Sequence, residues 1–442
     1  MFHKTNGALE TLVVIIIFAM LLVPTGLALT IRPVFASSPG TIRQEYLVVK
    51  PDMGGVGYDQ FYPELMVVNQ GDQVNLTVRN TDNEGFQLKI ENITTATIQP
   101  GSNTANGIEP VDTPVPIFNA TQAGIFAYSS EGHPEMNGYL VVLPSDWSSY
   151  NPSQVQRTFT VLAIPDFAGD AYDKWLPGVL VVNQGDKVSI NVRSMDTSPH
   201  GFAIAAYGID AAVNPAQQLD NGTLVPTTTS MPNFIASTSG IYIFLCTVPC
   251  GAGHQEMVGT LVVLSRGGSQ YSPVPVTSYN YLVVQPDYAG DGYDKFVPGV
   301  MFVNQGDLVY VRVRNTDTIP HGFTMPGYGI NNETIEPATQ SGNETTPTDS
   351  YVTPFLANQP GIYEFICSIP CGPGHGEMIG YLVVLPKLQG TTPTSTTQTT
   401  TTIAGGVSFE TAALTSFGMI IVGFIAGLIV LSRFAFPKKT ES

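Results

Sequence analysis

The amino-acid sequence predicts an all-β protein of three tandem Greek-key β-sandwiches, between an N-terminal signal or anchor segment and a C-terminal transmembrane helix. Three observations carry this prediction. The 442-residue chain repeats itself at fixed spacings, short segments in each repeat alternate between apolar and polar residues, and no long helical period lies between its two apolar ends. Only 12% of the residues are charged, while Gly and Pro are frequent, as is typical of turn-rich β domains.

The repeat sets the domain organisation. The segment 296–317 repeats the segment 175–196 at an offset of 121 residues, and the segment 61–82 precedes the second by 114 residues. A chain of this length exceeds one hydrophobic core and suits about three domains. We therefore expect three domains, at residues 43–145, 157–266 and 278–387.

Each repeat contains the pattern of a half-buried strand. Val188, Ile190 and Val192 are apolar, whereas the residues between them are polar, and the other two repeats alternate in the same way. Each repeat also closes on a short apolar run, GYLVVL or GTLVVL. Several short strands with turn residues between them favour a sandwich.

Both ends of the chain contain apolar segments that predict association with a membrane. Residues 1–36 read as a signal peptide or an N-terminal anchor, and residues 411–431 are uncharged and long enough to span a bilayer. The basic residues of the tail, 432–442, predict that it is cytoplasmic. Residues 388–410 form a Thr-rich stalk with little to bury. The β domains are therefore expected on the extracytoplasmic face of the cell membrane.

The charge balance limits the partners. The formal net charge is −17 and the isoelectric point is about 4.6. Because binding to phosphate needs clustered Lys and Arg, such an acidic chain is not expected to bind nucleic acid. A basic protein partner is compatible with this charge.

Cysteine and histidine gather in one repeated motif. CTVPCGAGHQEM begins at Cys246 and CSIPCGPGHGEM at Cys367, and these two segments hold all four cysteines of the chain. An upstream histidine precedes each segment at the same distance. The two candidate metal-ligand sets are His200, Cys246, Cys250, His254 and Met257, and His321, Cys367, Cys371, His375 and Met378.

The residue types favour copper. A disulfide would explain two cysteines in an oxidising compartment, but not the histidines and the methionine. Zinc takes Cys and His and seldom a thioether, whereas thiolate, imidazole and thioether together suit copper. A mononuclear blue-copper site would leave Cys246 without a role. A dinuclear site with two bridging thiolates and one histidine on each metal would use every residue of the set.

The motif C-x3-C-x3-H-x2-M with an upstream His resembles the CuA centre of cytochrome c oxidase subunit II and of the cupredoxin domain of nitrous oxide reductase. The resemblance implies cupredoxin-like sandwiches and two dinuclear CuA centres in this chain. In each centre both cysteines bridge the coppers, the two histidines are terminal ligands and the methionine is a weak axial ligand. The main-chain carbonyls of Val248 and Ile369 are the other axial ligands.

The resemblance also implies a function. The chain is expected to be a membrane-tethered electron-transfer protein with no substrate-converting active site of its own. It would accept electrons from a donor protein, a cytochrome or a small copper protein, and pass them to a haem-copper oxidase or a similar acceptor. The alternatives are a copper-binding assembly or storage protein, a mononuclear blue-copper carrier, and a disulfide-linked surface protein.

The first repeat departs from the motif. Glu84 stands where the upstream histidine is expected and Ser130 where the first cysteine is expected. The first repeat lacks five residues between Phe86 and His133, some of them in this loop. It has no second cysteine, while His133 and Met136 remain. We therefore predict a degenerate cupredoxin-like domain without a copper centre.

Overall fold

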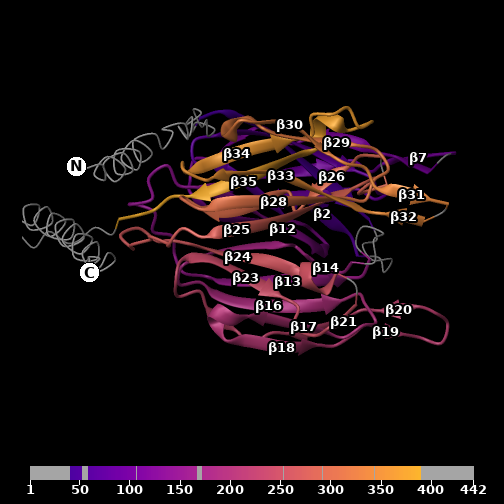
Figure 1. The fold of residues 1–442 in the computed structure, drawn as a ribbon, viewed down its shortest axis with the longest axis horizontal. Coiled ribbons are helices and arrows are strands. Elements are labelled where there is room, and N and C mark those ends of the chain that lie inside the picture. Colours follow the sequence, from indigo (N-terminus) through magenta and orange to yellow (C-terminus); the bar gives the residue numbers. More distant parts are fainter. Residues whose placement is uncertain are drawn as a thin grey trace, which may run out of the picture. The chain divides into compact units, whose positions relative to one another are not determined.

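Almost all the regular secondary structure in the described part of the chain is β-strand (Figure 1). The computed structural model describes residues 40–51, 58–105, 107–166, 172–251, 253–290, 292–342 and 344–389. The predicted signal or anchor segment, transmembrane helix and cytoplasmic tail lie outside these residues, as does the stalk from residue 390. Among the described residues, no helix is long and apolar enough to cross a membrane.

The first sandwich consists of a sheet ordered β10-β4-β1-β2, with β9 beside β4, and a sheet ordered β3-β12-β11-β5-β6. A small hairpin, β7-β8, extends from it. Its strands are β1 (Ile42–Lys50), β2 (Gln60–Tyr62), β3 (Leu65–Asn69), β4 (Gln73–Asn80), β5 (Phe86–Ile90), β6 (Thr94–Ile98), β7 (Ser102–Thr104), β8 (Gly107–Glu109), β9 (Val111–Pro114), β10 (Phe118–Asn119), β11 (Gly124–Ser130) and β12 (His133–Leu143).

The second sandwich, magenta in Figure 1, pairs a sheet ordered β14-β13-β16-β21, with β22 beside β16, with a sheet ordered β15-β24-β23-β17-β18. The hairpin β19-β20 extends from it. Its elements are β13 (Gln156–Ile164), β14 (Lys174–Leu176), β15 (Val179–Asn183), β16 (Lys187–Ser194), β17 (His200–Ile204), η2 (Ala205–Tyr207), β18 (Ile209–Val213), β19 (Gln217–Gln218), β20 (Leu224–Val225), β21 (Thr227–Ser230), β22 (Phe234–Ile235), β23 (Gly240–Leu245), η3 (His254–Glu256) and β24 (Val258–Leu264).

The third sandwich, orange to yellow in Figure 1, repeats the second with a sheet ordered β26-β25-β28-β33 and a sheet ordered β27-β35-β34-β29-β30. Its elements are β25 (Thr277–Gln285), β26 (Lys295–Val297), β27 (Val300–Asn304), β28 (Leu308–Asn315), β29 (His321–Met325), η4 (Pro326–Tyr328), β30 (Ile330–Ile335), β31 (Thr339–Ser341), β32 (Glu344–Thr346), β33 (Thr348–Leu356), β34 (Gly361–Ile366), η5 (His375–Glu377) and β35 (Ile379–Leu385).

The predicted strand pattern is confirmed by burial. Val188, Ile190 and Val192 on β16 are at most 1% exposed, while the residues between them are partly exposed. The alternation arises because one face of β16 covers the core and the other faces away from it. The prediction of an all-β fold is likewise confirmed.

The three sandwiches pack together in one compact unit. Each has its own apolar core, and two further clusters of buried side chains draw residues from all three. Pro63, Pro177 and Pro298 occupy equivalent places before β3, β15 and β27, and they line one small cavity. The equivalent segments of the three sandwiches therefore meet at one place.

The segments that join the sandwiches are packed as well. Tyr150 donates a hydrogen bond to Asn183 Oδ1 at 2.6 Å, and Tyr271 makes the equivalent bond to Asn304. Leu388, at the start of the predicted stalk, pairs through its backbone with Tyr271. These contacts fix the ends of the second and third sandwiches against their neighbours.

Candidate metal centres

The metal loop of the second sandwich runs between two paired strands. Cys246 follows the last residue of β23, His254 opens the short helix η3, and Met257 precedes β24. Gly253 has φ = +72°, a left-handed backbone that favours glycine, and a Cβ there would collide with the ring of Tyr172. The loop can therefore turn tightly enough to bring His254 back to the cysteines.

The predicted ligands of the second sandwich converge. The sulfur atoms of Cys246 and Cys250 lie 3.9 Å apart. Nδ1 of His200 lies 3.8 Å from Cys246 Sγ, and Nδ1 of His254 lies 3.5 Å from Cys250 Sγ. An S–S bond is about 2.05 Å long, so the cysteines are not disulfide-bonded. Each thiol instead faces one imidazole.

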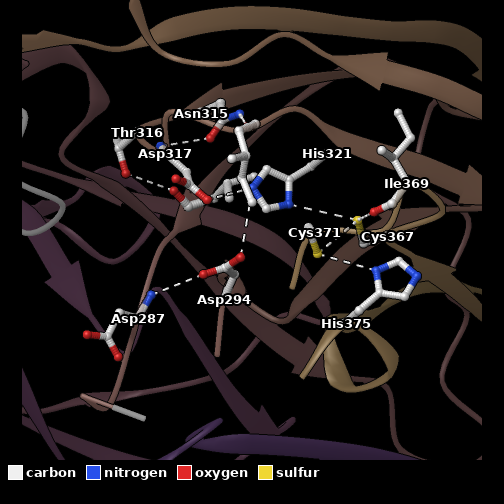
Figure 2. Close-up of polar contacts among 12 residues, drawn as sticks. Asp287, Asp294, Asn315, Thr316, Asp317, His321, Cys367, Ile369, Cys371 and His375 are labelled. Carbon is white, nitrogen blue, oxygen red and sulfur yellow. Dashed lines mark hydrogen bonds and ion pairs between the residues drawn. The ribbon is translucent and has the colours of Figure 1, made fainter. Parts of the chain in front are cut away.

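The third sandwich repeats this arrangement, as Figure 2 shows. Its cysteine sulfurs, from Cys367 and Cys371, are 3.7 Å apart. Nδ1 of His321 lies 3.8 Å from Cys367 Sγ, and Nδ1 of His375 lies 3.3 Å from Cys371 Sγ. The two cysteines and the upstream histidine are all buried.

The predicted axial groups are beside both clusters. The carbonyl oxygens of Val248 and Ile369 each lie 3.2 Å from the sulfur of the first cysteine. Met257 and Met378 are fully buried in the same apolar clusters as the cysteines. Their carbonyls accept hydrogen bonds from the backbone N–H of Cys246 and Cys367. All twelve predicted site residues thus gather in two clusters, and their role as ligands stays a prediction.

Close backbone approach shapes each cluster. The backbone N–H of Gly322 donates to Cys367 Sγ at 3.4 Å, and Gly201 donates to Cys246 at 3.5 Å. A Cβ on Gly322 would lie 2.8 Å from the backbone nitrogen of Ile369, closer than real contacts allow. Glycine after the upstream histidine is therefore needed for the loop to pack over β29, and the N–H groups stabilise thiolate charge.

Carboxylates hold the upstream histidines in place. Nε2 of His200 lies 2.9 Å from Asp196 Oδ2, and Nε2 of His321 lies 3.1 Å from Asp317 Oδ2. Asp294 also approaches His321 at 4.0 Å (Figure 2). A carboxylate on Nε2 fixes the ring so that Nδ1 points at the sulfurs, as outer partners of metal-bound histidines do.

Sequence reasoning missed these aspartates, although a signal existed. Asp196 and Asp317 each precede a candidate histidine by four residues, and they recur at the same 121-residue offset as the ligands. Carboxylates are hard ligands that suit other metals, so a pattern of copper ligands does not point to them.

The two cysteines of each cluster differ in acidity. Burial raises the pKa of Cys246, but hydrogen bonds from His200 and from the backbone N–H of Gly201 outweigh it, so this pKa lies below its ordinary value. Burial and the neighbouring Cys246 raise the pKa of Cys250 to about 12. Cys367 and Cys371 follow the same order. A bound metal ion would deprotonate both thiols of a pair.

Each loop is also tied to the next sandwich. Glu256 accepts a hydrogen bond from Arg312 of the third sandwich at 2.8 Å. Glu377 pairs with Arg79 of the first sandwich at 3.3 Å and with Lys295 at 3.6 Å. Both clusters therefore lie beside a boundary between sandwiches.

The first sandwich holds a different group at the equivalent place. Glu84 is exposed and Ser130 is buried, and the structure brings neither into a cluster of metal-binding side chains. Ligand atoms of Asp59, His133 and Glu135 lie within 4.8 Å of one another. His133 makes an ion-pair contact with Glu135 at 3.2 Å and packs edge-on against Phe86. The prediction that this sandwich lacks a copper centre remains a prediction.

The curated proteins that are similar to parts of the chain include three copper proteins or oxidase subunits, and no family model matches the chain. Nitrous-oxide reductase of Stutzerimonas stutzeri is 31% identical over 85 residues, which are 19% of this chain and 12% of that protein. Copper-containing nitrite reductase of Neorhizobium galegae is 34% identical over 119 residues, 23% of this chain and 30% of that protein. The chain thus spans less than a third of either relative.

A shorter relative is covered almost completely. Cytochrome c oxidase subunit 2 of Thermus thermophilus is 30% identical over 135 residues, which are 30% of this chain and 89% of that protein. Among solved structures, the copper-containing nitrite reductase of Thermus scotoductus aligns with 79% of this chain and all of that one, at 17% identity. Its TM-score of 0.20 is too low to support an argument.

Proposed function

Because the chain belongs to the cytochrome c oxidase subunit 2 family of cupredoxin-like copper proteins, we propose that it is an electron-transfer protein with two dinuclear CuA centres. His200, Cys246, Val248, Cys250, His254 and Met257 would hold one centre, and His321, Cys367, Ile369, Cys371, His375 and Met378 the other. When bound, each copper pair supplies one-electron exchange.

The observation that carries the proposal is the pairing within each cluster. Two cysteine sulfurs lie 3.9 Å or 3.7 Å apart, and each of them faces the Nδ1 atom of a different histidine. A set of two thiolates and two imidazoles in this symmetrical order suits two soft metal ions that share both sulfurs. A single blue-copper ion would use only one of the thiolates.

The protein's own residues provide a rigid and mostly dry site. The upstream histidines are at most 1% exposed and are oriented by Asp196 and Asp317, so their rings need not turn when the charge of the site changes. His254 and His375 are the partly exposed histidines of the two sets. Electrons are therefore expected to enter or leave at these two histidines.

The partners and the location are part of the proposal. Residues 1–36 and 411–431 would tether the chain to the cell membrane, with the sandwiches on the extracytoplasmic face. A cytochrome or a small copper protein would be the electron donor, and a haem-copper oxidase or a similar complex the acceptor. Net charge −17 favours a donor with a basic docking surface.

Metal content and spectra of the purified full-length chain test the proposal. Two dinuclear thiolate centres require about four copper ions per chain. The oxidised protein is expected to give a paramagnetic signal in which one unpaired electron is shared by two copper nuclei.

Other results would favour the rival functions. About two copper ions per chain, each with an isolated blue-copper signal, would indicate mononuclear carriers. A colourless protein that holds Cu(I) and does not exchange electrons with a cytochrome would indicate storage or assembly. Either result would contradict the proposal.

A further inference from the structure

Three boundaries between sandwiches can be compared at one equivalent position. In the parallel pairs of β12 with β3, β24 with β15 and β35 with β27, the residues at matching places are Tyr139, Thr260 and Tyr381. Two boundaries thus have a tyrosine, and the boundary between the second and third sandwiches has a threonine.

The boundary between the third and first sandwiches is filled. The guanidinium of Arg43 lies over the ring of Tyr381, 5.0 Å from its centroid, and Glu45 hydrogen-bonds to the same tyrosine. Arg43 also pairs with the buried Asp72 at 3.4 Å. Only a cavity of about 40 Å³ remains beside Glu45 and Tyr381.

The boundary between the first and second sandwiches is filled in a similar way. Tyr139 packs on Phe159 with the ring centroids 5.1 Å apart. Arg157, the counterpart of Arg43, pairs with the buried Asp186 at 2.7 Å. The cavity beside Tyr139 and Phe159 is about 20 Å³.

The boundary between the second and third sandwiches is open. The counterparts of Arg43 and Glu45 on β25 are Ser278 and Asn280, so all three filling positions carry small side chains. A groove of about 560 Å³ lies there, lined by Thr260, Ser278 and Asn280. This volume is within the range of small-molecule sites, roughly 300–1,000 Å³.

The wall of the groove includes a carboxylate without its expected cation. Asp307, the counterpart of Asp72 and Asp186, is 2% exposed and accepts backbone N–H groups of Val276 and Asn304. Among the residues that the structure describes, it has no ion pair. Asp72 and Asp186 each have an arginine.

The remaining wall is apolar and aromatic. Ile243, Val258 and Tyr279 line the groove and are 57%, 43% and 80% exposed. The groove's own cations, Lys174 and Arg312, are both bound to Glu256, the first through its carbonyl and the second through its carboxylate. Apolar surface and one buried carboxylate suit a ligand that combines an aromatic ring with a positive charge.

We propose that this groove is a binding site for an aromatic cation, a small molecule with an aromatic ring and one amidinium, guanidinium or ammonium group. The ring takes the place that Tyr139 and Tyr381 fill at the other boundaries. The cation takes the place of Arg43 and Arg157, beside Asp307. This site is separate from the cysteines, so its existence does not depend on the proposed electron transfer.

Calorimetric titration of the full-length chain with benzamidine tests the proposal, with benzamide as the neutral probe of the same shape. Benzamidine is expected to bind to one site per chain and benzamide at least about tenfold more weakly, because it lacks the charge-assisted bond to Asp307. The double variant Thr260→Tyr/Ser278→Arg rebuilds the filled boundary. It is expected to lose benzamidine binding and to melt at a higher temperature than the wild type.

A second variant tests whether the double variant loses binding because the groove is filled or because the chain misfolds. Asp307→Asn keeps the volume and is expected to weaken benzamidine about tenfold while leaving benzamide unchanged. No benzamidine binding to the wild type, or equal binding to the wild type and the double variant, would overturn the proposal. So would a dimer of the wild-type chain that Tyr279→Asp dissociates, because a second copy would then cover the groove.

Discussion

The first and third sandwiches share one fold and differ at the end where the candidate metal ligands of the third lie. In the first, β11 and β12 stay paired as far as Ser130 and His133, so only two residues form the turn. In the third, the residues from Cys367 to Met378 separate the two equivalent strands. The metal loop is therefore an extension of a hairpin that also closes without it.

The cores below the two ends are alike. Met136 and Met378 are both fully buried, as are Tyr128 in the first sandwich and Phe365 in the third. Burial of these side chains supplies much of the stability of each sandwich, independently of any metal. The candidate ligand set is therefore separable from the fold.

The largest expected effect is the loss of one centre from a folded chain. Cys371→Ser removes one of two bridging thiolates and should abolish the copper of the third sandwich while leaving the second intact, so that half of the bound copper is lost. Metal analysis and paramagnetic spectra measure this. Cys250→Ser is the matched variant for the second sandwich. Loss of both centres in either variant would show that they are not independent.

The reverse experiment adds a centre to the first sandwich. The segment from Ser130 to Met136 is replaced by the loop from Cys367 to Met378, together with Glu84→His, to rebuild the missing ligands at the equivalent sequence positions. The chimera is expected to bind about two more copper ions per chain, because a dinuclear site needs this ligand set. The same loop graft without Glu84→His is the control. A chimera with no added copper would mean that the first sandwich has lost more than its ligands.

The sequence alone was sufficient for the strands and for the two clusters. Alternation in Val188, Ile190 and Val192 marks a buried face, and a repeat offset of 121 residues marks side chains in equivalent places. Such signals are local or periodic, so they can be read without knowing how the chain returns on itself.

The contacts between sandwiches were not predictable in this way. Arg79 and Glu377 lie almost 300 positions apart in the chain and meet at 3.3 Å. The repeat gives each of them counterparts in the other sandwiches, but it does not tell which sandwiches face each other. The small residue Thr260 at the groove is recognised as a departure only when the residues at the three boundaries are aligned through the register of their strands. The parts of the chain beyond residue 389 and before residue 40 remain sequence-based predictions.

Arg79→Ala is a smaller test of how the first sandwich supports the third. Arg79 pairs with Glu377 beside the metal loop and with Asp112, and its guanidinium lies 3.7 Å from the ring centroid of Tyr293. Arg79→Ala leaves the partly buried Glu377 without this partner and should lower the free energy of unfolding by about 3 kcal/mol. Chemical denaturation measures this change.

Arg79→Ala should also perturb the spectrum of the copper centre in the third sandwich. It should leave the spectrum of the centre in the second sandwich unchanged. Arg193 is the counterpart of Arg79 in the second sandwich. It packs beside Tyr58 of the first sandwich, whose corresponding loop has no cysteines. Arg193→Ala should therefore leave both spectra unchanged. A shift of the second centre in Arg79→Ala would contradict the view that each loop is supported by one neighbour.

A further expected effect concerns a carboxyl that only the first sandwich carries. Glu64 precedes β3, and its counterparts before β15 and β27 are Gly178 and Gly299. Burial raises the pKa of Glu64 to about 8 from an ordinary value of 4.5. The folded state therefore prefers the neutral acid, and the stability that this form provides is complete below pH 4.5 and is lost as pH rises through 8.

Glu64→Gln keeps the neutral shape at every pH. The variant should match the wild type near pH 4 and exceed its free energy of unfolding by about 4 kcal/mol at pH 8. Denaturation curves across this range measure the difference, with the exposed Glu84→Gln as a control that should follow the wild type. An equal pH dependence of Glu64→Gln and wild type would mean that Glu64 is ionised without cost in the folded protein. Water would then reach Glu64, at the place where the three sandwiches meet, more easily than the low exposure of this side chain implies.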